Sequence, residues 1–302
     1  MMTMAPVLSI VVAVKDGVAN VPALLAALED RGQDVEIIFA CAGSVPDEAA
    51  GDSVSTFALP SETLVPALWS EGIARARGDR VALTTAQFVP DNSWLARLVE
   101  ADLKRWVGIG GAIDNDPGSS FHNWAIFFLR YSAFAPPLTA GKTEEIAADN
   151  AIYDRAAILA HPDLLAQGFW EPSFHRRFHV DGRNLALDPG LVVVHHGTVS
   201  VRNFARQRHL HGRVYGIERA QRSGLGRNLL LLLSSPLVPP LLLARIVARV
   251  ARRPRFRGKL FPSLPWLLRF TFAWGSGEAI GYASMLRQRM GAGRSMQPEG
   301  HM

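Results

Sequence analysis

The sequence predicts an α/β protein with a mostly parallel sheet, and three observations lead to this fold class. Short β-branched runs alternate with segments of helical periodicity along the first part of the chain. The run at residues 7–14, VLSIVVAV, is continuously apolar, which is typical of a strand buried on both faces. Polar segments that contain glycine follow the predicted strands and indicate turns between the elements.

The remaining elements follow in order along the chain. Residues 21–28 have helical spacing, with a proline in the first turn, where proline is tolerated. Residues 62–77 predict a second helix, which ends at Gly78. Trp94 is expected to begin a third helix after a loop at residues 85–93. Further strands are predicted at residues 35–40, 53–58, 80–84 and 191–194, and Gly110 and Gly111 are expected at the end of another strand.

Composition limits the class of protein. The chain has 302 residues, 48% of them hydrophobic, which is enough for one large domain or two small ones. Cys41 is the single cysteine, so an internal disulfide framework is excluded and a reducing compartment is expected. We expect no signal peptide, because no small-residue cleavage site follows the first apolar run.

The net charge of +5 conceals an asymmetry along the chain. Residues 223–302 contain 12 Lys and Arg against 2 Asp and Glu, whereas the remainder contains 20 against 25. A basic segment alone is compatible with nucleic-acid binding, but no reader motif accompanies it here. Because the basic residues are mixed with Leu, Phe and Trp runs, an anionic membrane surface is the better expectation.

The order of these segments resembles the family 2 glycosyltransferases of the membrane-associated bacterial type, which have the GT-A fold that binds nucleotide sugars. The resemblance covers roughly residues 7–220. It implies a GT-A domain at residues 1–222 and a helical, membrane-associated region at residues 223–302. The segments that carry it are LSIVVAVKDG, VEIIFACAGS, SEGIARARGDRVALTTAQFVPDNSWL, GIGGAIDN, AADNAIYDRAAI, GFWEPSFHRRFHVDGRNLALDPGLVVVHHG and RNFARQRHLHGR.

The resemblance implies a donor site, but this sequence departs from the family at two acidic positions. An acidic pair commonly follows the second strand, where Cys41 and Ala42 stand here. The metal-binding acidic motif should end the strand after Asp79, and no carboxylate stands there. We therefore expect no firmly bound cofactor, with Mn²⁺ or Mg²⁺ left open and His196 as a candidate ligand. The residues expected around the donor are Val12, Val14, Lys15, Cys41, Thr84, Thr85, Ala86 and Gln87.

The acceptor side keeps more of the family pattern. Glu171 matches the first acid of the family's Glu-Asp pair and would be the general base, whereas the alternative is an exposed helix-start residue. Asp149 and Asn150 fall where the family lines the acceptor, together with Trp170. A helix N-cap is the alternative for this Asp-Asn pair, and we prefer it for Asp149.

Histidines and arginines could replace the missing carboxylate-bound metal. His195 and His196 follow a predicted strand and point to opposite faces, so they cannot easily chelate one metal together. In the segment after them, the resemblance implies that Arg206, Arg208 and His211 neutralise the donor diphosphate. By helical spacing, Arg202, Arg206, His209 and Arg213 share a face. A solvated or headgroup-facing basic helix is the alternative.

The C-terminal region predicts helices that lie in a membrane surface. Residues 228–250 are very apolar but are interrupted by prolines, and residues 260–285 are aromatic and apolar. The basic segment ARRPRFRGK between them would face outside if the first segment crossed the membrane outward. In-plane or re-entrant helices, anchored by Trp266 and Trp274, fit better. An ordinary buried helical subdomain is the alternative, although WGSGEAIGYA also resembles membrane-bound family members.

The function that these inferences predict is transfer of a sugar from a nucleotide-sugar donor to a lipid-linked or membrane-proximal glycan acceptor. The reaction would be metal-independent and would take place at the cytoplasmic face of the plasma membrane. The alternative is a catalytically inactive GT-A homologue that acts as a binding or assembly partner. Nucleic acid is not an expected partner.

Overall fold

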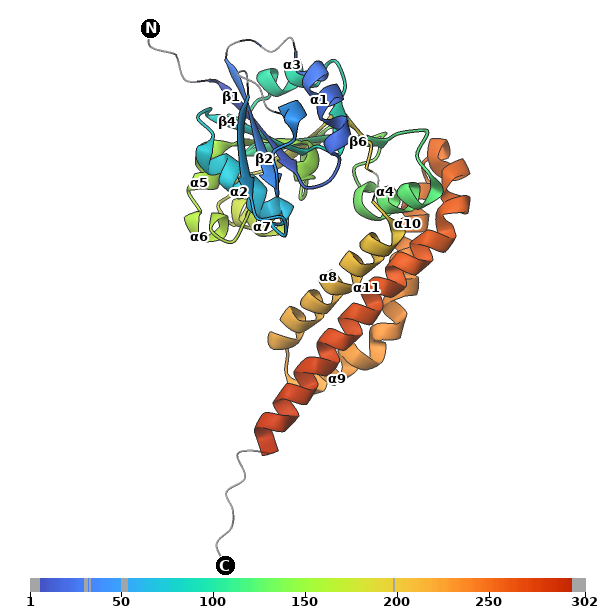
Figure 1. The fold of residues 1–302 in the computed structure, drawn as a ribbon. Helices are drawn as coiled ribbons and strands as arrows, with labels where there is room; N and C mark the ends of the chain where they lie inside the picture. Colours follow the sequence, from blue (N-terminus) through green and yellow to red (C-terminus); the bar gives the residue numbers. More distant parts are fainter. Residues whose placement is uncertain (1–5, 30–31, 33, 50–53, 198, 295–302) are drawn as a thin grey trace, which may run out of the picture. The chain divides into compact units, whose positions relative to one another are not determined.

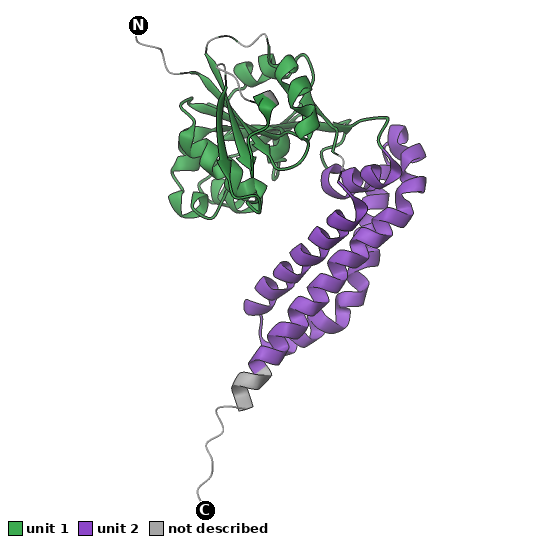
Figure 2. Ribbon diagram, viewed as in Figure 1, with its two compact units in different colours: residues 1–119, 133–198 green, residues 120–132, 199–302 purple. Residues whose placement is uncertain are grey.

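The computed structural model describes residues 6–29, 32, 34–49, 54–197 and 199–294. The chain forms two compact units, which Figure 2 distinguishes by colour. The first unit contains residues 1–119 and 133–198, and the second contains residues 120–132 and 199–302. Each unit is described separately below.

The first unit is an α/β structure built on a mixed sheet. Among the described residues the sheet has nine strands, in the order β3-β2-β1-β4-β8-β6-β9-β5, with β7 paired to β9. Its first four strands pair in parallel, as the sequence predicts (Figure 1). These strands are β1 (Leu8–Val14), β2 (Val35–Ala42), β3 (Ser55–Leu59) and β4 (Arg80–Thr85).

The strand direction continues past an inserted antiparallel strand. Strand β8 (Ala151–Asp154) runs antiparallel to both β4 and β6 (Gly108–Asn115), so β6 runs in the same direction as β4. Strand β9 (Leu185–His195) is parallel to β6. The carboxyl ends of β1, β2, β3, β4, β6 and β9 therefore meet at one edge of the sheet, where open α/β sheets bind ligands. We call this the carboxyl edge.

The prediction that Gly110 and Gly111 end a strand is wrong, because both lie inside β6. A Cβ atom on Gly110 would stand 2.5 Å from Cβ of Ile146, and one on Gly111 would stand 1.9 Å from the carbonyl oxygen of Leu191. Glycine is required here because neighbouring backbone approaches closely, not because the chain turns. The strand continues to Asn115, which brings further polar residues to the carboxyl edge.

Helices and short strands complete the first unit. The predicted helices are present as α1 (Val21–Ala27), α2 (Val65–Arg75) and α3 (Trp94–Glu100). The predicted loop at residues 85–93 contains a short strand, β5 (Phe88–Pro90), which pairs with β9. Apolar side chains of the sheet, α2 and α7 form a core that includes Trp69, Phe169 and Phe174. The other elements are β7 (Gly141–Thr143), η1 (Val18–Asn20), η2 (Asp47–Ala49), η3 (Ala148–Asn150), α5 (Arg155–Leu159), α6 (Pro162–Leu165) and α7 (Glu171–Val180).

The second unit is helical, and its two longest helices pack through glycines. Helix α8 (Val201–Gln221) and helix α11 (Pro254–Arg294) run side by side (Figure 1). A Cβ on Gly212 would stand 2.3 Å from the carbonyl oxygen of Trp274, and one on Gly277 would stand 2.0 Å from that of His209. Small residues that let helix backbones touch are common in membrane helix pairs. The other helical segments are α4 (Phe121–Tyr131), α9 (Leu225–Ser234), η4 (Ser235–Leu237) and α10 (Val238–Ala251).

The compact units divide the chain at a different place from the predicted boundary at residue 222. Helix α8, which the sequence places in the GT-A domain, groups with the C-terminal helices, and so does α4. One helical stretch, Leu225–Ala251, is long and apolar enough by length and composition to cross a membrane. Only 17% of its most apolar window is buried within the protein, so it does not have the burial of a soluble core helix.

Candidate functional site

The turn between β4 and β5 lies at the centre of the carboxyl edge. Its residues, Ala86 and Gln87, occupy the position at which the resemblance implies a metal-binding acid. The N–H of Ala86 donates to the carbonyl of Ala13 over 3.1 Å, and the N–H of His196 donates to the carbonyl of Gln87 over 2.8 Å. The side-chain amide of Asn20 donates to the carbonyl of Ala86 over 3.0 Å. The ends of β1, β4 and β9 are therefore joined at this turn.

Most side chains predicted to surround the donor are buried at this edge. Cys41 is completely buried, and burial raises the pKa of its thiol to about 11. Donor contact at these positions stays a prediction. The buried members of the set are Val12, Val14, Cys41, Thr84, Thr85, Ala86 and Gln87.

Lys15 is the half-buried exception in that predicted set. Its ammonium nitrogen, Nζ, donates to the carbonyl of Thr63 over 2.7 Å and to that of Ser61 over 3.4 Å. These carbonyls belong to the segment that follows β3. Lys15 thus places one positive charge between the ends of β1 and β3, beside the turn described above.

The ends of β6 and β9 contribute two polar pairs. Asn115 and His195 are partners in the strand register, and Oδ1 of Asn115 lies 3.0 Å from Nδ1 of His195. Both side chains are buried. Next to them, the carboxylate of Asp116 lies 3.6 Å from Nδ1 of His196, and both groups are partly exposed. The two histidines thus have different partners, and the prediction that they do not chelate one metal together stays a prediction.

Asn115 was missed by the sequence reasoning, whereas Asp91, Asp114 and Asp116 were left open as residues that could replace the lost carboxylates. The signal that could have found Asn115 is the parallel pairing of β6 with β9, which aligns their polar ends. Placing the strand end at Gly110 and Gly111 hid that signal. Asp116 contacts His196, whose backbone N–H is bonded to Gln87.

Glu171 begins α7 and holds the segment that leads into β8. Its Oε1 accepts a hydrogen bond from the backbone N–H of Ala148 in η3. An acidic side chain in the first turn of a helix is favoured by the helix dipole. The side chain is half-buried. The alternative to a general base, an exposed residue at the start of a helix, therefore differs from the structure in its exposure. No described contact tests its role as a general base, which stays a prediction.

A buried tyrosine-histidine pair lies beside Glu171. The hydroxyl of Tyr153 lies 3.1 Å from Nε2 of His175, and both residues are buried. Burial, followed by the charges of Glu171 and Asp149, holds the pKa of Tyr153 well above its usual value. Burial, followed by the charge of His179, lowers the pKa of His175 to about 4. Near neutral pH both groups are therefore uncharged, while the two carboxylates lie close enough to act on Tyr153.

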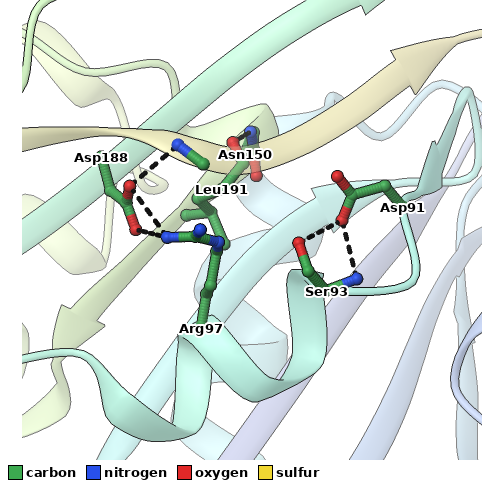
Figure 3. Close-up of polar contacts among 7 residues, drawn as sticks. Asp91, Ser93, Arg97, Asn150, Asp188 and Leu191 are labelled. Carbon is green, nitrogen blue, oxygen red and sulfur yellow. Dashed lines mark hydrogen bonds and ion pairs between the residues drawn. The ribbon is translucent and has the colours of Figure 1, made fainter.

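Asn150 has a structural role in the fold. Its amide nitrogen donates to the carbonyls of Ala112 and Leu191, each over 2.9 Å, and its oxygen accepts from the indole N–H of Trp94 over 2.7 Å. The side chain is fully buried, and its predicted contact with an acceptor hydroxyl stays a prediction. Figure 3 shows its bond to Leu191 beside the bulge of β9, where Asp188 pairs with Arg97.

The other predicted acceptor residues differ in exposure. Asp149 is buried within η3 and is not the N-cap of a helix, contrary to the preferred alternative. Trp170 is 43% exposed, and its indole N–H donates to the carbonyl of Gln167 over 3.0 Å. Of the acceptor residues, Trp170 is therefore the one with a face open to solvent. A separate cleft of about 220 Å³ lies near Arg97 and Asp188 and contains none of these residues.

The described residues do not fit a divalent metal ion. Among them, no group of three or more histidine, cysteine or acidic side chains converges so that it could hold one. Asp116 and His196 supply two groups near the β4–β5 turn, which is fewer than the oxygen-rich coordination that Mn²⁺ and Mg²⁺ favour. The reaction proposed for this protein includes no metal ion.

The predicted diphosphate ligands lie in the second unit. Arg206, Arg208 and His211 are all on α8, and the guanidinium carbon of Arg208 stands 4.2 Å from the ring centre of Trp274. Burial, followed by the charge of Arg130, lowers the pKa of Arg208 to about 10. Burial, then Arg208 and Arg130, also lower the pKa of His211. Arg130, on α4, was not considered by the sequence reasoning. The role of Arg206, Arg208 and His211 in a donor site stays a prediction.

Comparisons with known proteins find a likeness among solved structures. No family model and no curated protein matches the chain. A solved structure of a mannosyltransferase, PcManGT from Pyrobaculum calidifontis in complex with GDP-Man and Mn²⁺, is similar at 15% sequence identity and a TM-score of 0.46. The alignment covers 98% of this chain and 82% of that one. A likeness at this level establishes neither a family nor a substrate.

Proposed function

We propose that this protein is a glycosyltransferase that takes a sugar from a nucleotide-sugar donor at the carboxyl edge of its sheet. The observation that carries the proposal is the shared direction of β1, β2, β4, β6 and β9. It brings the ends of β1, β2 and β4, where the resemblance to the family 2 enzymes implies donor contacts, to the same edge as the ends of β6 and β9. In sheets of this kind the ligand lies outside the carboxyl ends of the strands.

In the proposed reaction, an acceptor hydroxyl oxygen attacks the anomeric carbon of the sugar. The bond from that carbon to the diphosphate oxygen breaks, and the diphosphate leaves with the bonding electrons. Glu171 takes the proton of the acceptor hydroxyl. Lys15 balances part of the charge of the leaving group, as a fixed cation does in a site of low dielectric constant.

The acceptor that we propose is lipid-linked or lies close to a membrane. Two features of the second unit support this proposal. The stretch Leu225–Ala251 is apolar yet largely unburied, and the surrounding region is strongly basic. Both features are typical of a protein that lies on an anionic membrane surface. The cytoplasmic leaflet is the surface that this charge favours.

The test is release of nucleotide diphosphate by the purified full chain. The chain would be incubated with UDP- and GDP-sugars, with and without an extract of membrane lipids. The proposal expects release above the rate without protein for at least one donor, with an increase when the lipid extract is present. Absence of release for every donor, by a chain shown to be folded, would contradict it.

A catalytically inactive GT-A homologue that acts as a binding or assembly partner is the second candidate. Two observations favour it: neither family acidic position carries a carboxylate, and the side chains at those positions are buried. This candidate expects no nucleotide binding at all, whereas the enzyme expects binding. Titration with nucleotides therefore separates the two candidates.

A further inference from the structure

A polar cavity lies within the second unit where α8 ends and α9 begins. Its volume is about 320 Å³, and it is lined by Tyr215, Glu218, Arg219, Arg222, Ser223 and Arg227. Three of the six lining residues are arginines and one is acidic, so the lining carries net positive charge. The first turn of α9 contributes Arg227, and the positive end of that helix dipole adds to the charge of the arginines.

One of the three arginines is fixed by a buried network. Glu278 is 2% exposed, accepts from the hydroxyl of Tyr282 over 2.6 Å and from the indole N–H of Trp274 over 3.0 Å. Arg219 lies 3.7 Å from the same carboxylate and donates to the Tyr282 hydroxyl over 3.4 Å. This network therefore holds one guanidinium at the cavity wall.

The other two arginines are not engaged in this way. Within the described residues, the side chains of Arg222 and Arg227 make no ion pair with an acidic group. Both are exposed. Arginine clusters with free guanidinium forks match the geometry of phosphate oxygens, which accept several hydrogen bonds at once. The cavity thus has one guanidinium held in place and two available for an anion.

An apolar stripe begins at the same cavity. Five exposed leucines recur at intervals of four residues, from the first turn of α9 through η4 into α10, so each lies about one helical turn from the next. The exposure of each side chain is between 50% and 70%. The leucines are Leu225, Leu229, Leu233, Leu237 and Leu241.

We propose that this cavity binds the phosphate group of an anionic lipid whose acyl chains lie along the leucine stripe. The shared chemistry is a phosphate monoester or diester, and the occupant to which we commit is a membrane lipid. The charge of the cavity and the adjoining apolar face favour this occupant over a soluble phosphate. The inference rests on the membrane association in the proposed function and adds a specific headgroup site to it.

Vesicle binding by the full chain tests the proposal. The vesicles would be phosphatidylcholine alone or phosphatidylcholine with phosphatidylglycerol, and binding would be measured by flotation. Because Arg222 and Arg227 would donate charge-assisted hydrogen bonds to the bound phosphate, which a diffuse basic surface does not make, the double substitution Arg222→Ala with Arg227→Ala is expected to weaken binding to the anionic vesicles by about twentyfold or more. Arg219 is left intact because it belongs to the buried network.

A matched variant separates a headgroup site from a diffuse basic surface. The double substitution Arg245→Ala with Arg252→Ala removes the same charge from exposed positions that do not line the cavity. The proposal expects at most a threefold loss for this control. Equal losses for both variants would overturn the proposal. The proposal would also be overturned if millimolar inorganic phosphate removed the difference in vesicle binding between the unmodified chain and the Arg222 and Arg227 variant, because that result would identify a soluble ligand.

The vesicle series also separates this proposal from the one on which it rests. Equal binding of the unmodified chain to neutral and anionic vesicles would retain membrane association but overturn the phosphate site. No binding to either vesicle would overturn both membrane association and the lipid site, while leaving nucleotide-dependent activity to be judged by nucleotide release. The unmodified chain could also self-associate in a concentration-dependent way. If the double substitution Leu229→Asp with Leu233→Asp removed that self-association, the leucine stripe would be assigned to a second copy of the chain, and a lipid occupant would be contradicted.

Discussion

Glu171 accepts a hydrogen bond from the backbone N–H of Ala148, and so joins the start of α7 to the segment that leads into β8. A carboxylate oxygen can accept a proton as well as a hydrogen bond. We expect this carboxylate to take the proton of the acceptor hydroxyl.

Glu171→Gln is expected to abolish most of the activity while retaining the fold. The amide oxygen still accepts from the N–H of Ala148, but it cannot take a proton, so kcat should fall by roughly 10²–10⁴-fold. The melting temperature should change little. Glu171→Ala should in addition lower the free energy of unfolding by about 1–3 kcal/mol, because a part-buried N–H loses its acceptor. Full activity in the glutamine variant would remove Glu171 from the mechanism.

The buried His175 predicts a pH-dependent stability of the first unit. Its pKa is about 4 in the folded chain against a usual value near 6.5, so the unfolded chain binds a proton that the folded chain does not between these values. The contribution is fully present above about pH 6.5, is lost as pH falls, and the loss is complete near pH 4. Its total size is about 3 kcal/mol.

Urea unfolding of the full chain at several pH values measures this effect. His175→Gln removes the titrating group and retains a hydrogen-bond partner for the Tyr153 hydroxyl. The difference in free energy of unfolding between the two chains should therefore shift by about 3 kcal/mol between pH 7 and pH 4, in the direction that makes the unmodified chain less stable at low pH. Parallel pH profiles would show that His175 titrates normally.

The close packing of α8 on α11 predicts that one glycine of α11 is intolerant to substitution. A Cβ on Gly277 would stand 2.0 Å from the carbonyl oxygen of His209, so Gly277→Ala must separate the helices. Overpacking of this kind costs about 1–3 kcal/mol. Thermal unfolding followed by circular dichroism should show a lower melting temperature.

Gly258→Ala is the matched control on the same helix. Nothing lies within 4 Å of the position that its Cβ would occupy. Alanine is a better helix former than glycine by up to about 1 kcal/mol, so this variant should be as stable as the unmodified chain or more stable. Destabilisation of equal size in both variants would mean that glycine is not required for contact between the helices.

Sequence reasoning succeeded where the signal is local. The β-branched runs that became β1, β2, β3 and β4 carry their own pattern, and so do the helices that start near Val21 and Trp94. Strand β5 was missed because it has three residues and owes its pairing to β9, far along the chain. The place of β5 in the sheet depends on contacts with a distant strand, and the periodicity of the local sequence does not reveal such contacts.

The candidate site was harder to predict for the same reason. Gly110 and Gly111 are glycines because Ile146 and Leu191 approach them, and both neighbours are distant in sequence. Misplacing that strand end concealed Asn115. Asn150 has the residue type of a ligand-binding group, but its amide is used by three partners within the fold. Residue type predicts which chemistry is available, whereas burial and internal partners decide which groups remain free for a ligand.

The central claim is that nucleotide diphosphate binds at a site whose charge is balanced by fixed cations. Calorimetric titration of the full chain with UDP and GDP, in EDTA and in Mn²⁺, tests it most directly. The account predicts binding of at least one nucleotide with an affinity that is the same, within threefold, in both conditions. Binding that requires Mn²⁺, or no binding of either nucleotide by the folded chain, would contradict it.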